Sequence, residues 1–293
     1  MHKSGFVNII GNPNVGKSTL MNALVGERLS IITSKAQTTR HRIMGIVSGE
    51  EFQIVYSDTP GILKPAYKLQ ESMMKFVTGA VSDADVILYV TDTVEQGDRS
   101  AEIVGQIRQS GIPTIVVINK IDLSDPARLD ALVEKWQAEL PAARIVPVSA
   151  REQFNIEGLF RTILELLPEG PAYYPKDTLT DKTLRFFASE IIREKILRFY
   201  DKEIPYCCEI EIESYREEPT IDRIAATIYV ARESQKGILI GHKGEKLKRV
   251  GQAAREDMEQ FLGKKVFLQL FVKVSDDWRN NERLLRRFGY EQE

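Results

Sequence analysis

The chain has 293 residues, which is more than one ordinary domain and indicates about two. Hydrophobic residues make up 43% and charged residues 28%, the balance of a globular protein rather than of a disordered or collagen-like one. The formal net charge is -2, which excludes a chain that is basic throughout, so any RNA or membrane surface must be a local patch.

The two cysteines, Cys207 and Cys208, are adjacent in the sequence, and this spacing disfavours a disulfide between them. We therefore expect a reduced, cytoplasmic protein in which, on a strand, one thiol faces the core and the other does not. The apolar start of the chain is too short for a signal-peptide core, and no segment reaches the ~18 apolar residues that span a bilayer. Contact with a membrane is expected only at its surface.

From Phe6 to about Leu167, short apolar runs alternate with amphipathic segments of helical length. The expected strands are Phe6–Ile10, Ile54–Tyr56, Val86–Val90, Thr114–Ile118 and Arg144–Val148. The expected helices are Ser18–Val25, Leu69–Ala80, Arg99–Gln109, Leu129–Glu139 and Ile156–Leu166. This alternation predicts an α/β domain with a mostly parallel sheet, and Arg42–Val47 with Phe52–Tyr56 predicts an antiparallel hairpin at one edge.

The segment from Pro168 to Pro175 contains three prolines and a glycine, which disfavour both a helix and a central strand. We therefore predict a first domain over residues 1–168, a linker over 169–180 and a second domain over 181–293. The second domain is expected to be α+β, in the order helix, strand, strand, helix, helix, strand, helix. These elements are Leu184–Tyr200, Cys208–Ser214, Arg223–Ala231, Gly237–Ile240, Leu247–Leu262, Val266–Val274 and Asp277–Phe288.

The segment Gly11–Ser18 matches the G-x-x-x-x-G-K-[ST] pattern of a phosphate-binding loop between a strand and a helix. Backbone N–H groups and the helix N-terminus would hold the phosphates. Lys17 would reach the β- and γ-phosphates, and the Ser18 hydroxyl would bind Mg²⁺. By itself, the motif leaves open a glycine-rich turn without a ligand.

Three further motifs follow other strands of the same sheet, in the order expected for a guanine-nucleotide site. Asp58-Thr59-Pro60-Gly61 would contact the metal through Asp58 and the γ-phosphate through the Gly61 N–H. Asn119-Lys120-Ile121-Asp122 places a carboxylate where it can accept two donors of guanine that adenine lacks, and Ser149-Ala150 offers a backbone N–H to the guanine carbonyl. Ligands of open α/β sheets bind at the carboxyl ends of the strands, where all four motifs lie.

The segment Lys35–Arg40 is the expected switch, in which Thr39, with Thr38 second, would bind the metal only while the γ-phosphate is present. The residue after Gly61 is Ile62, which lacks the amide that orients the attacking water in Ras-like GTPases. The nucleotide-binding set is therefore Gly11, Asn12, Pro13, Asn14, Val15, Gly16, Lys17, Ser18, Thr19, Asp58, Thr59, Pro60, Gly61, Ile62, Asn119, Lys120, Asp122, Ser149 and Ala150. Within it we expect the metal ligands Ser18, Thr39 and Asp58, and catalytic roles for Lys17, Asn14, Thr39 and Gly61.

In the second domain, Gly241-His242-Lys243-Gly244 lies between two helical stretches and is similar to the G-x-x-G loop of KH domains. Basic residues surround it, which suits a nucleic-acid backbone. The same spacing also fits a plain turn between helices, but the element order is that of the type II KH fold. The expected RNA contacts are Ile238, Ile240, Gly241, His242, Lys243, Gly244, Lys246, Lys248 and Arg249, although Ile238 and Ile240 are equally consistent with core positions.

Over its first half the chain resembles translation-factor-like P-loop GTPases, and with the KH motif it resembles the Era family of GTPases over its whole length. The resemblance implies binding and slow hydrolysis of GTP to GDP with Mg²⁺, and K⁺ held by Asn14. It also implies binding to small-subunit (16S) rRNA near its 3′ end and a role in maturation of the 30S subunit. A monomer in the cytoplasm, also found at the inner face of the cell membrane, is the expected form.

Two other functions remain open from the sequence. A passive RNA-binding scaffold would bind GTP with little turnover. A GTPase partner in an RNA-modification system is disfavoured, because the sequence has no Cys/His metal cluster and no second cofactor motif.

Overall fold

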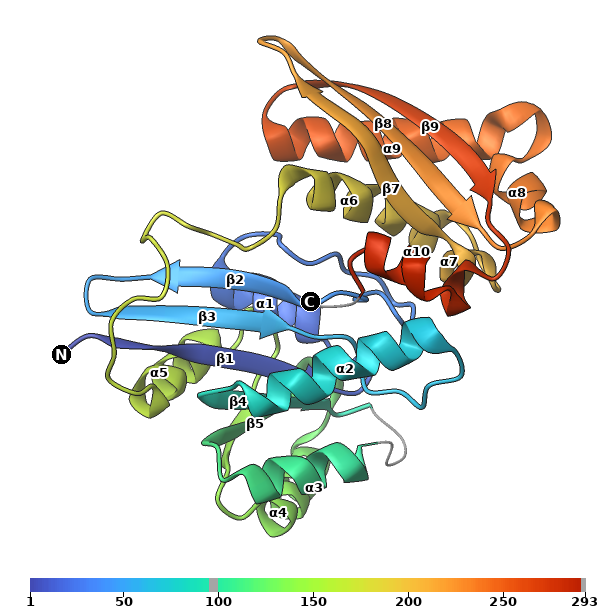
Figure 1. The fold of residues 1–293 in the computed structure, drawn as a ribbon. Coiled ribbons are helices and arrows are strands. Elements are labelled where there is room, and N and C mark those ends of the chain that lie inside the picture. Colours follow the sequence, from blue (N-terminus) through green and yellow to red (C-terminus); the bar gives the residue numbers. More distant parts are fainter. Residues whose placement is uncertain (95–99, 291–293) are drawn as a thin grey trace. The chain divides into compact units, whose positions relative to one another are not determined.

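The computed structural model describes residues 1–94 and 100–290. The chain divides into two compact units, one formed by Met1–Pro65 with Gln70–Asp181 and the other by Ala66–Leu69 with Lys182–Glu293. Each unit has its own sheet (Figure 1).

The first unit contains a six-stranded sheet in the order β2-β3-β1-β4-β5-β6. Its strands are β1 Lys3–Gly11, β2 Ile43–Ser48, β3 Phe52–Asp58, β4 Val86–Asp92, β5 Thr114–Asn119 and β6 Arg144–Pro147. All neighbouring pairs are parallel except β2 with β3, so the predicted mostly parallel sheet with an antiparallel hairpin at its edge is confirmed. Strand β4 is buried at every position, as expected for a strand covered on both faces.

Helices cover both faces of this sheet. They are α1 Lys17–Val25, α2 Lys68–Ser82, α3 Ala101–Ser110, α4 Pro126–Glu139 and α5 Ile156–Leu166, with a 3₁₀ turn η1 over Ile121–Leu123. Helices α2, α3 and α4 share a buried core with the strands on one face, and α1 and α5 lie on the other (Figure 1). The expected start of the third helix, Arg99, lies outside the described residues.

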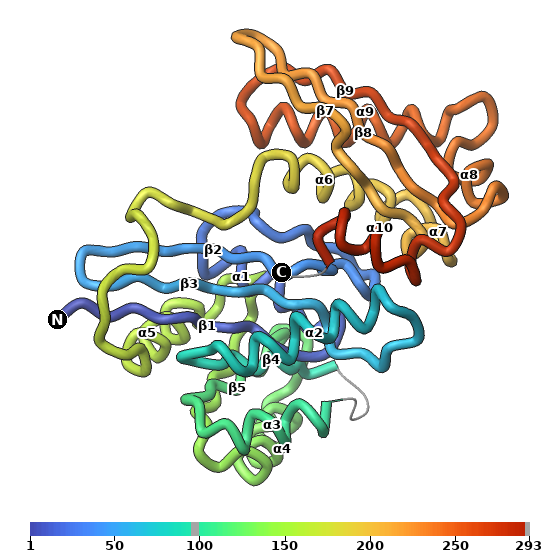
Figure 2. Tube along the Cα trace, viewed as in Figure 1, coloured from blue at the N-terminus to red at the C-terminus, as the bar shows by residue number. Residues whose placement is uncertain are grey.

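The proline-rich segment after α5 is hydrogen-bonded to the β2–β3 hairpin. The Ile46 N–H donates to the carbonyl of Leu179 at 2.8 Å, and Gly45 and Thr180 form an antiparallel bridge. The amide of Gln53 donates to the Tyr174 carbonyl at 2.8 Å. The yellow-green trace in Figure 2 passes from α5 along this hairpin toward α6. The linker therefore adds backbone pairing to the edge of the first sheet.

The second unit has the three-stranded sheet β7-β8-β9, in which β7 and β8 are antiparallel and β8 and β9 are parallel. Its strands are β7 Glu209–Glu217, β8 Ile221–Val230 and β9 Lys265–Val274. Its helices are α6 Leu184–Phe199, α7 Ile204–Cys207, α8 Glu233–Ile240, η2 His242–Gly244, α9 Glu245–Leu262, η3 Trp278–Asn280 and α10 Glu282–Arg287. This is the predicted type II KH order, with the short α7 added.

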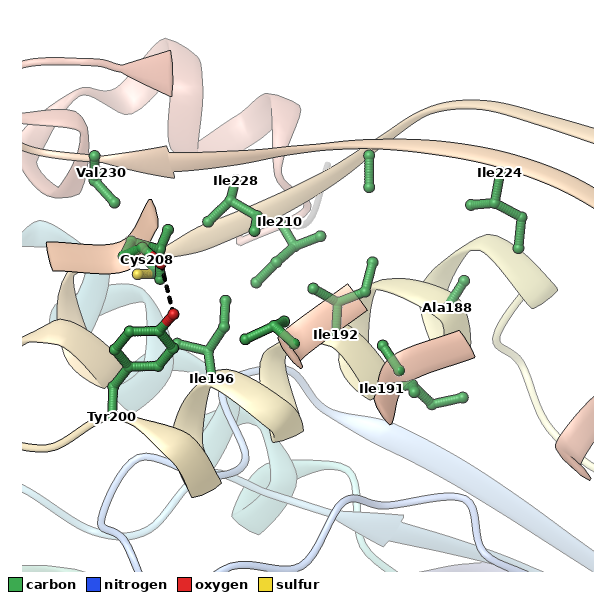
Figure 3. Close-up of a cluster of buried hydrophobic side chains, with 14 of the residues drawn as sticks. Ala188, Ile191, Ile192, Ile196, Tyr200, Cys208, Ile210, Ile224, Ile228 and Val230 are labelled. Carbon is green, nitrogen blue, oxygen red and sulfur yellow. Dashed lines mark hydrogen bonds between the residues drawn. The ribbon is translucent and has the colours of Figure 1, made fainter. Parts of the chain in front are cut away.

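The core of the second unit lies between the helices and one face of its sheet. Isoleucines of α6, including Ile192 and Ile196, pack with Ile210, Ile224 and Ile228 from the strands (Figure 3). Strand residues alternate between two faces, so these apolar positions all point to the helical side. The burial of these apolar side chains is the main source of stability for this unit.

Two expectations for this half differ from the structure. Cys207 and Cys208 are both buried, because Cys207 ends α7 and Cys208 follows it, so neither lies on the strand that was expected to turn one thiol outward. The last segment is not one helix over Asp277–Phe288. Asn281 separates η3 from α10, and its side chain accepts from the Leu284 N–H as an N-cap, which starts a new helix.

Candidate nucleotide site and nucleic-acid groove

The phosphate-binding loop joins the end of β1 to the start of α1. Gly16 has φ 95° and a Cβ there would lie 2.3 Å from Nδ2 of Asn119, so only glycine fits this turn. The next residue, Lys17, is buried, and its ammonium donates to the carbonyls of Gly11 and Asn12 at 3.0 and 2.8 Å. The Lys17 charge is thereby held at the mouth of the loop, where phosphates would lie.

Three oxygen-bearing side chains converge beside this loop. The Ser18 hydroxyl lies 2.8 Å from the Thr39 hydroxyl and donates to Oδ2 of Asp58 at 2.7 Å. Oδ1 of Asp58 is buried without a hydrogen-bond partner, and burial raises the pKa of this carboxyl, an effect that Lys17 partly offsets. A buried carboxylate oxygen and two hydroxyls suit a hard cation, so these residues fit Mg²⁺. When bound with GTP, this ion neutralises charge on the phosphate oxygens.

The structure distinguishes the two candidate switch threonines. Thr39 is only 7% exposed and also donates to Asp58 at 3.4 Å. Thr38 instead lies 2.6 Å from the Thr33 hydroxyl and donates to the carbonyl of Lys35, within its own loop. Thr39, and not Thr38, therefore lies with Ser18 and Asp58, where these residues would hold the metal.

The other end of the site is built around Asn119, at the end of β5. Its amide donates to the Val15 carbonyl at 2.9 Å, and its Oδ1 accepts from the Ala150 N–H at 3.0 Å. Asn119 therefore ties the phosphate loop to the loop after β6. It would position the loops at both ends of a bound nucleotide.

The two neighbouring residues of the same motif are also fixed. Lys120 donates to the Asn14 carbonyl at 2.6 Å and forms an ion pair with Asp92 at 2.5 Å. Asp122 accepts from the Ser149 hydroxyl at 2.6 Å through Oδ1. A carboxylate has several acceptor positions, so this bond orients Asp122 and leaves acceptor capacity for two donors of a guanine base.

Two adjoining cavities run along these residues. The larger, of about 930 Å³, is lined by Asn119, Lys120, Asp122, Ser149 and Ala150. The smaller, of about 530 Å³, is lined by Lys17, Ser18, Thr39 and Gly61. Gly16, Thr19, Ile32, Lys120 and Arg151 line both, so the cavities share a wall. Together the two cavities suit a nucleotide, with its base in the larger cavity and its phosphates in the smaller one.

The remaining predicted residues lie on or behind the same surface. Thr59 donates to the Ile9 carbonyl at 2.7 Å, which anchors the Asp58–Ile62 segment, and Pro60 is buried beside it. Pro13 approaches Gly61 so closely that a Cβ on Gly61 would lie 2.8 Å from its Cα. Asn14 is exposed with φ 65° and lines the phosphate end. Val15 is buried, and Asn12 is 5% exposed.

Ile62 does not face the cavity. It is 4% exposed and belongs to the core between the sheet and α2, α3 and α4, while its N–H donates to the Gly11 carbonyl at 3.2 Å. The position that carries a water-orienting glutamine in Ras-like GTPases is therefore a core position in this chain.

The second unit places its glycine-bounded loop between α8 and α9. Gly244 has φ 80° and precedes the first residue of α9, so the loop uses a backbone conformation that favours glycine. His242 and Lys243 are exposed in the 3₁₀ turn η2. The N-terminus of the 18-residue helix α9 adds partial positive charge beside these side chains.

A groove of about 490 Å³ continues from this loop along α9 and β9. It is lined by Gly244, Leu247, Lys248, Gly251, Gln252, Arg255, Leu268 and Leu270. The α9 residues recur every three or four positions and so form one face of the helix. The groove has an apolar floor of leucines and cationic side chains on the helix, a combination that suits a single-stranded nucleic acid.

The other predicted RNA residues take different positions. Ile238 is 43% exposed and Ile240 is half-buried, while Leu239 between them is fully buried in the core. Gly241 opens the loop at the end of α8. Lys246 and Arg249 point to α6, because Lys246 lies over the Tyr200 ring and Arg249 over the Phe199 ring at 4.4 Å.

Sequence reasoning missed several residues of both sites. The nucleotide cavity also contains Arg28, Ile32 and Arg151, and the groove contains Gln252, Arg255, Leu268 and Leu270. Helical spacing from Gly244 would have located the α9 residues. Arg151 directly follows the Ser149-Ala150 motif, whereas no local motif marks Arg28 or Ile32.

Comparisons with known proteins agree with both units. A family model described as 50S ribosome-binding GTPase matches residues 6–120, and a KH-domain model matches residues 203–279. A relative named GTPase Era from Alkaliphilus metalliredigens is 46% identical, with 99% of each chain covered. Another GTPase Era, from Staphylococcus haemolyticus, is 45% identical and covers 99% of this chain and 97% of the relative.

Two solved structures are similar over nearly the whole chain. One is Era in complex with MgGDPNP and nucleotides 1506–1542 of 16S ribosomal RNA, with TM-score 0.96, 41% identity and 100% of both chains covered. The other is a variant of Aquifex aeolicus Era bound to GDP and AlF4⁻, with TM-score 0.94 and 40% identity. It covers 99% of this chain and 100% of that one.

The fold and the site define a P-loop GTPase that carries a type II KH domain. Its nucleotide is GTP or GDP, and its metal is Mg²⁺. With identities of 44–46% over nearly full length, the chain belongs to the Era family of GTPases. Within residues 1–94 and 100–290, no helix is both long and apolar enough to cross a membrane.

Proposed function

We propose that this GTPase is a switch that binds the 3′ region of small-subunit rRNA and acts in maturation of the 30S subunit. The observation that carries the proposal is the presence, in one chain, of a guanine-nucleotide cavity and the groove of Gly244, Lys248 and Leu270. The relative with TM-score 0.96 was solved with both a GTP analogue and a 16S rRNA fragment, which supports this RNA as the occupant.

Thr39 is the residue that would couple the nucleotide to the first switch. Its hydroxyl lies within 2.8 Å of Ser18, and its loop also carries Thr33, Lys35 and Thr38 along the phosphate end of the cavity. Loss of the γ-phosphate removes a ligand of the metal and hence a reason for this loop to stay ordered. The two nucleotide states would therefore differ in the conformation of residues 33–39.

Hydrolysis needs a group other than Ile62 to assist it. We propose K⁺ held by Asn14, which is exposed at the phosphate end and has its carbonyl fixed by Lys120. Slow intrinsic turnover follows, because no side chain at position 62 can orient water. Single-turnover hydrolysis at equal ionic strength in K⁺ and in Na⁺ tests this: N14A should remove any K⁺ stimulation, and equal rates for wild type in both salts would contradict it.

The RNA proposal is tested by fluorescence anisotropy with an RNA copied from nucleotides 1506–1542 of 16S rRNA and a scrambled RNA of equal length. K248A should weaken binding and reduce its salt dependence, since it removes a phosphate contact. K135A, which removes another exposed lysine, from α4, is the matched control. Equal affinity for the two RNAs, or an equal effect of the two variants, would overturn the proposed specificity.

The same titrations with a GTP analogue and with GDP decide whether the chain is a switch. Tighter RNA binding in one nucleotide state requires, by linkage, that RNA alter the nucleotide affinity by the same factor. A passive scaffold would bind RNA equally in both states and turn over GTP negligibly with RNA present.

We place the protein in the cytoplasm, with reversible association at the inner face of the membrane. The basic residues Arg283 and Arg286 of α10 support a surface contact with anionic lipids. Flotation with vesicles that contain anionic or only zwitterionic lipid tests this, and equal recovery with both would contradict it. Sedimentation of the full chain tests the expected monomer.

A further inference from the structure

The second unit presents aromatic rings on the face of its sheet that points away from the helices. On β9, residues alternate between the core side and this outer face, which carries Phe267, Gln269 and Phe271. The two phenylalanines are 43% and 55% exposed. The proposed RNA groove uses only the other face of β9, through Leu268 and Leu270, so it does not account for these rings.

The chain itself covers one end of this outer face. The Tyr229 ring on β8 contacts Phe288 at 5.3 Å, and Arg287, the last residue of α10, pairs with Glu211 at 2.6 Å. The hydroxyl of Tyr290 donates to Glu209 at 2.5 Å. These contacts end at Tyr229, so the exposed phenylalanines lie farther along β9, toward its start.

Two of the three β8 side chains next to the phenylalanines are small. The β8 residues paired with Phe267, Gln269 and Phe271 are Arg223, Ala225 and Thr227. Ala225 and Thr227 are small, so a planar group could approach the rings. Arg223 lies over the Phe267 ring at 5.4 Å, and Lys265 and Lys273 stand at the two ends of β9.

We propose that Arg223, Phe267, Gln269 and Phe271, here named the outer-face patch, form a second binding surface for single-stranded RNA. Residues on one face of a strand are about 6.6 Å apart, so the patch presents a ring, an amide and a second ring in series. Aromatic rings stack on any base, and the glutamine amide can donate to or accept from a base edge. This inference rests on the proposed RNA-binding function.

Charge and position both favour RNA over a protein as the occupant. The two rings are separated by a polar residue and bordered by three cationic residues, whereas the centre of a protein interface is depleted of charge. Within the described part of the chain, Arg223 pairs with Glu218 at 3.0 Å and Lys265 pairs with Glu259 at 3.2 Å, and both cations lie at the surface. Such exposed pairs contribute little, so phosphates can replace them at small cost.

The patch is also continuous with the groove. Strand β9 is the edge strand of the sheet (Figure 1). The groove lies on its α9 side and the patch on its other face, so that only the width of β9 separates them. An RNA held in the groove by one segment can pass around this edge and place a flanking segment on the patch. The outer-face patch would therefore bind the nucleotides that flank those in the groove.

The test uses the full chain with GTP analogue and the RNA of nucleotides 1506–1542, shortened from either end in steps of two nucleotides. F267A and F271A should each weaken binding of the longest RNA about tenfold, the size of a lost base stack. Their effect should vanish for the shortest RNA that still binds. F261A removes a ring that is 42% exposed on α9 and is the matched control.

Crosslinking provides a second readout that does not depend on affinity. RNA carrying 4-thiouridine in the flanking nucleotides should crosslink to the peptide containing Phe267–Phe271, and thiouridine in the groove segment should not. Wild-type affinity in F267A and F271A together with an absent crosslink would overturn the inference. Weaker binding to 30S subunits but unchanged binding to RNA would show that the patch contacts a protein instead.

The outcome can be separated from failure of the proposed function. If K248A abolishes RNA binding and the patch variants do not alter it, the proposed groove is retained as the RNA site and the outer-face patch is rejected. If the wild-type chain binds the true and scrambled RNAs equally, the proposed function fails first. Circular dichroism of each variant checks that exposed substitutions leave the fold intact.

Discussion

Replacing Asp122 by asparagine should convert the base end of the cavity from guanine to xanthine selectivity. The carboxylate is held by the Ser149 hydroxyl at 2.6 Å, so an isosteric amide can occupy the same place. The amide retains one acceptor but presents an NH₂ group to the second guanine donor. One charge-assisted hydrogen bond is lost and one guanine donor is left unpaired, at a cost of about 3–5 kcal/mol, or roughly 100- to 5,000-fold in GDP affinity.

Xanthine has a carbonyl where guanine has its amine, and that carbonyl can accept from the new NH₂ group. D122N should therefore bind XDP more tightly than GDP, as measured by titration with fluorescent analogues of both nucleotides. D130N, which neutralises an exposed aspartate on α4, is the matched control and should keep the wild-type preference. A D122N protein that binds GDP within threefold of wild type would refute the role assigned to this carboxylate.

Three further changes test the remaining parts of the structure. T39A should lower the Mg²⁺-dependent affinity for a GTP analogue at least tenfold, with little change in the affinity for GDP, whereas T38A should leave both affinities unchanged. Equal effects of T39A and T38A in a Mg²⁺ titration would contradict the assignment of Thr39. I62Q should not accelerate single-turnover hydrolysis and should lower stability by about 2–3 kcal/mol in urea, because the new amide is buried without partners. Y200F should lower the free energy of unfolding by about 1 kcal/mol, since the Tyr200 hydroxyl donates to the buried Leu239 carbonyl at 2.6 Å. Urea unfolding can be followed by Trp278 fluorescence in a Trp136→Phe background, and an unchanged urea midpoint would show that this bond does not stabilise the fold.

The strands and the nucleotide motifs could be predicted because each is a local signal. The apolar run Val86–Val90 is buried on both faces as its composition indicates, and Lys17 and Asp58 are identified by fixed spacing within short motifs. Such patterns reflect the chemistry of a single segment. They can therefore be identified without knowing what the segment packs against.

The missed features depend on contacts between distant segments. Asn119 belongs to a recognisable motif, but its bonds to Val15 and Ala150 span 104 and 31 residues of sequence. Burial of Cys207 arises from α7, a helix of four residues that is too short to produce a periodic pattern. The Leu268 and Leu270 side chains look like core positions of a strand, and only the place of β9 at the sheet edge exposes them to the groove.

Ile62 differs from the glutamine of Ras-like GTPases, and the fold shows what this residue does instead. From the sequence it signals only the absence of a glutamine. In the structure its side chain belongs to the core shared by the sheet and α2, while its N–H is bound to the Gly11 carbonyl of the phosphate loop. The residue therefore anchors the Asp58–Ile62 segment to the site instead of reaching toward a water molecule. Any acceleration of hydrolysis must come from groups that enter the phosphate end of the cavity from elsewhere, such as an ion at Asn14 or a partner that approaches residues 33–39.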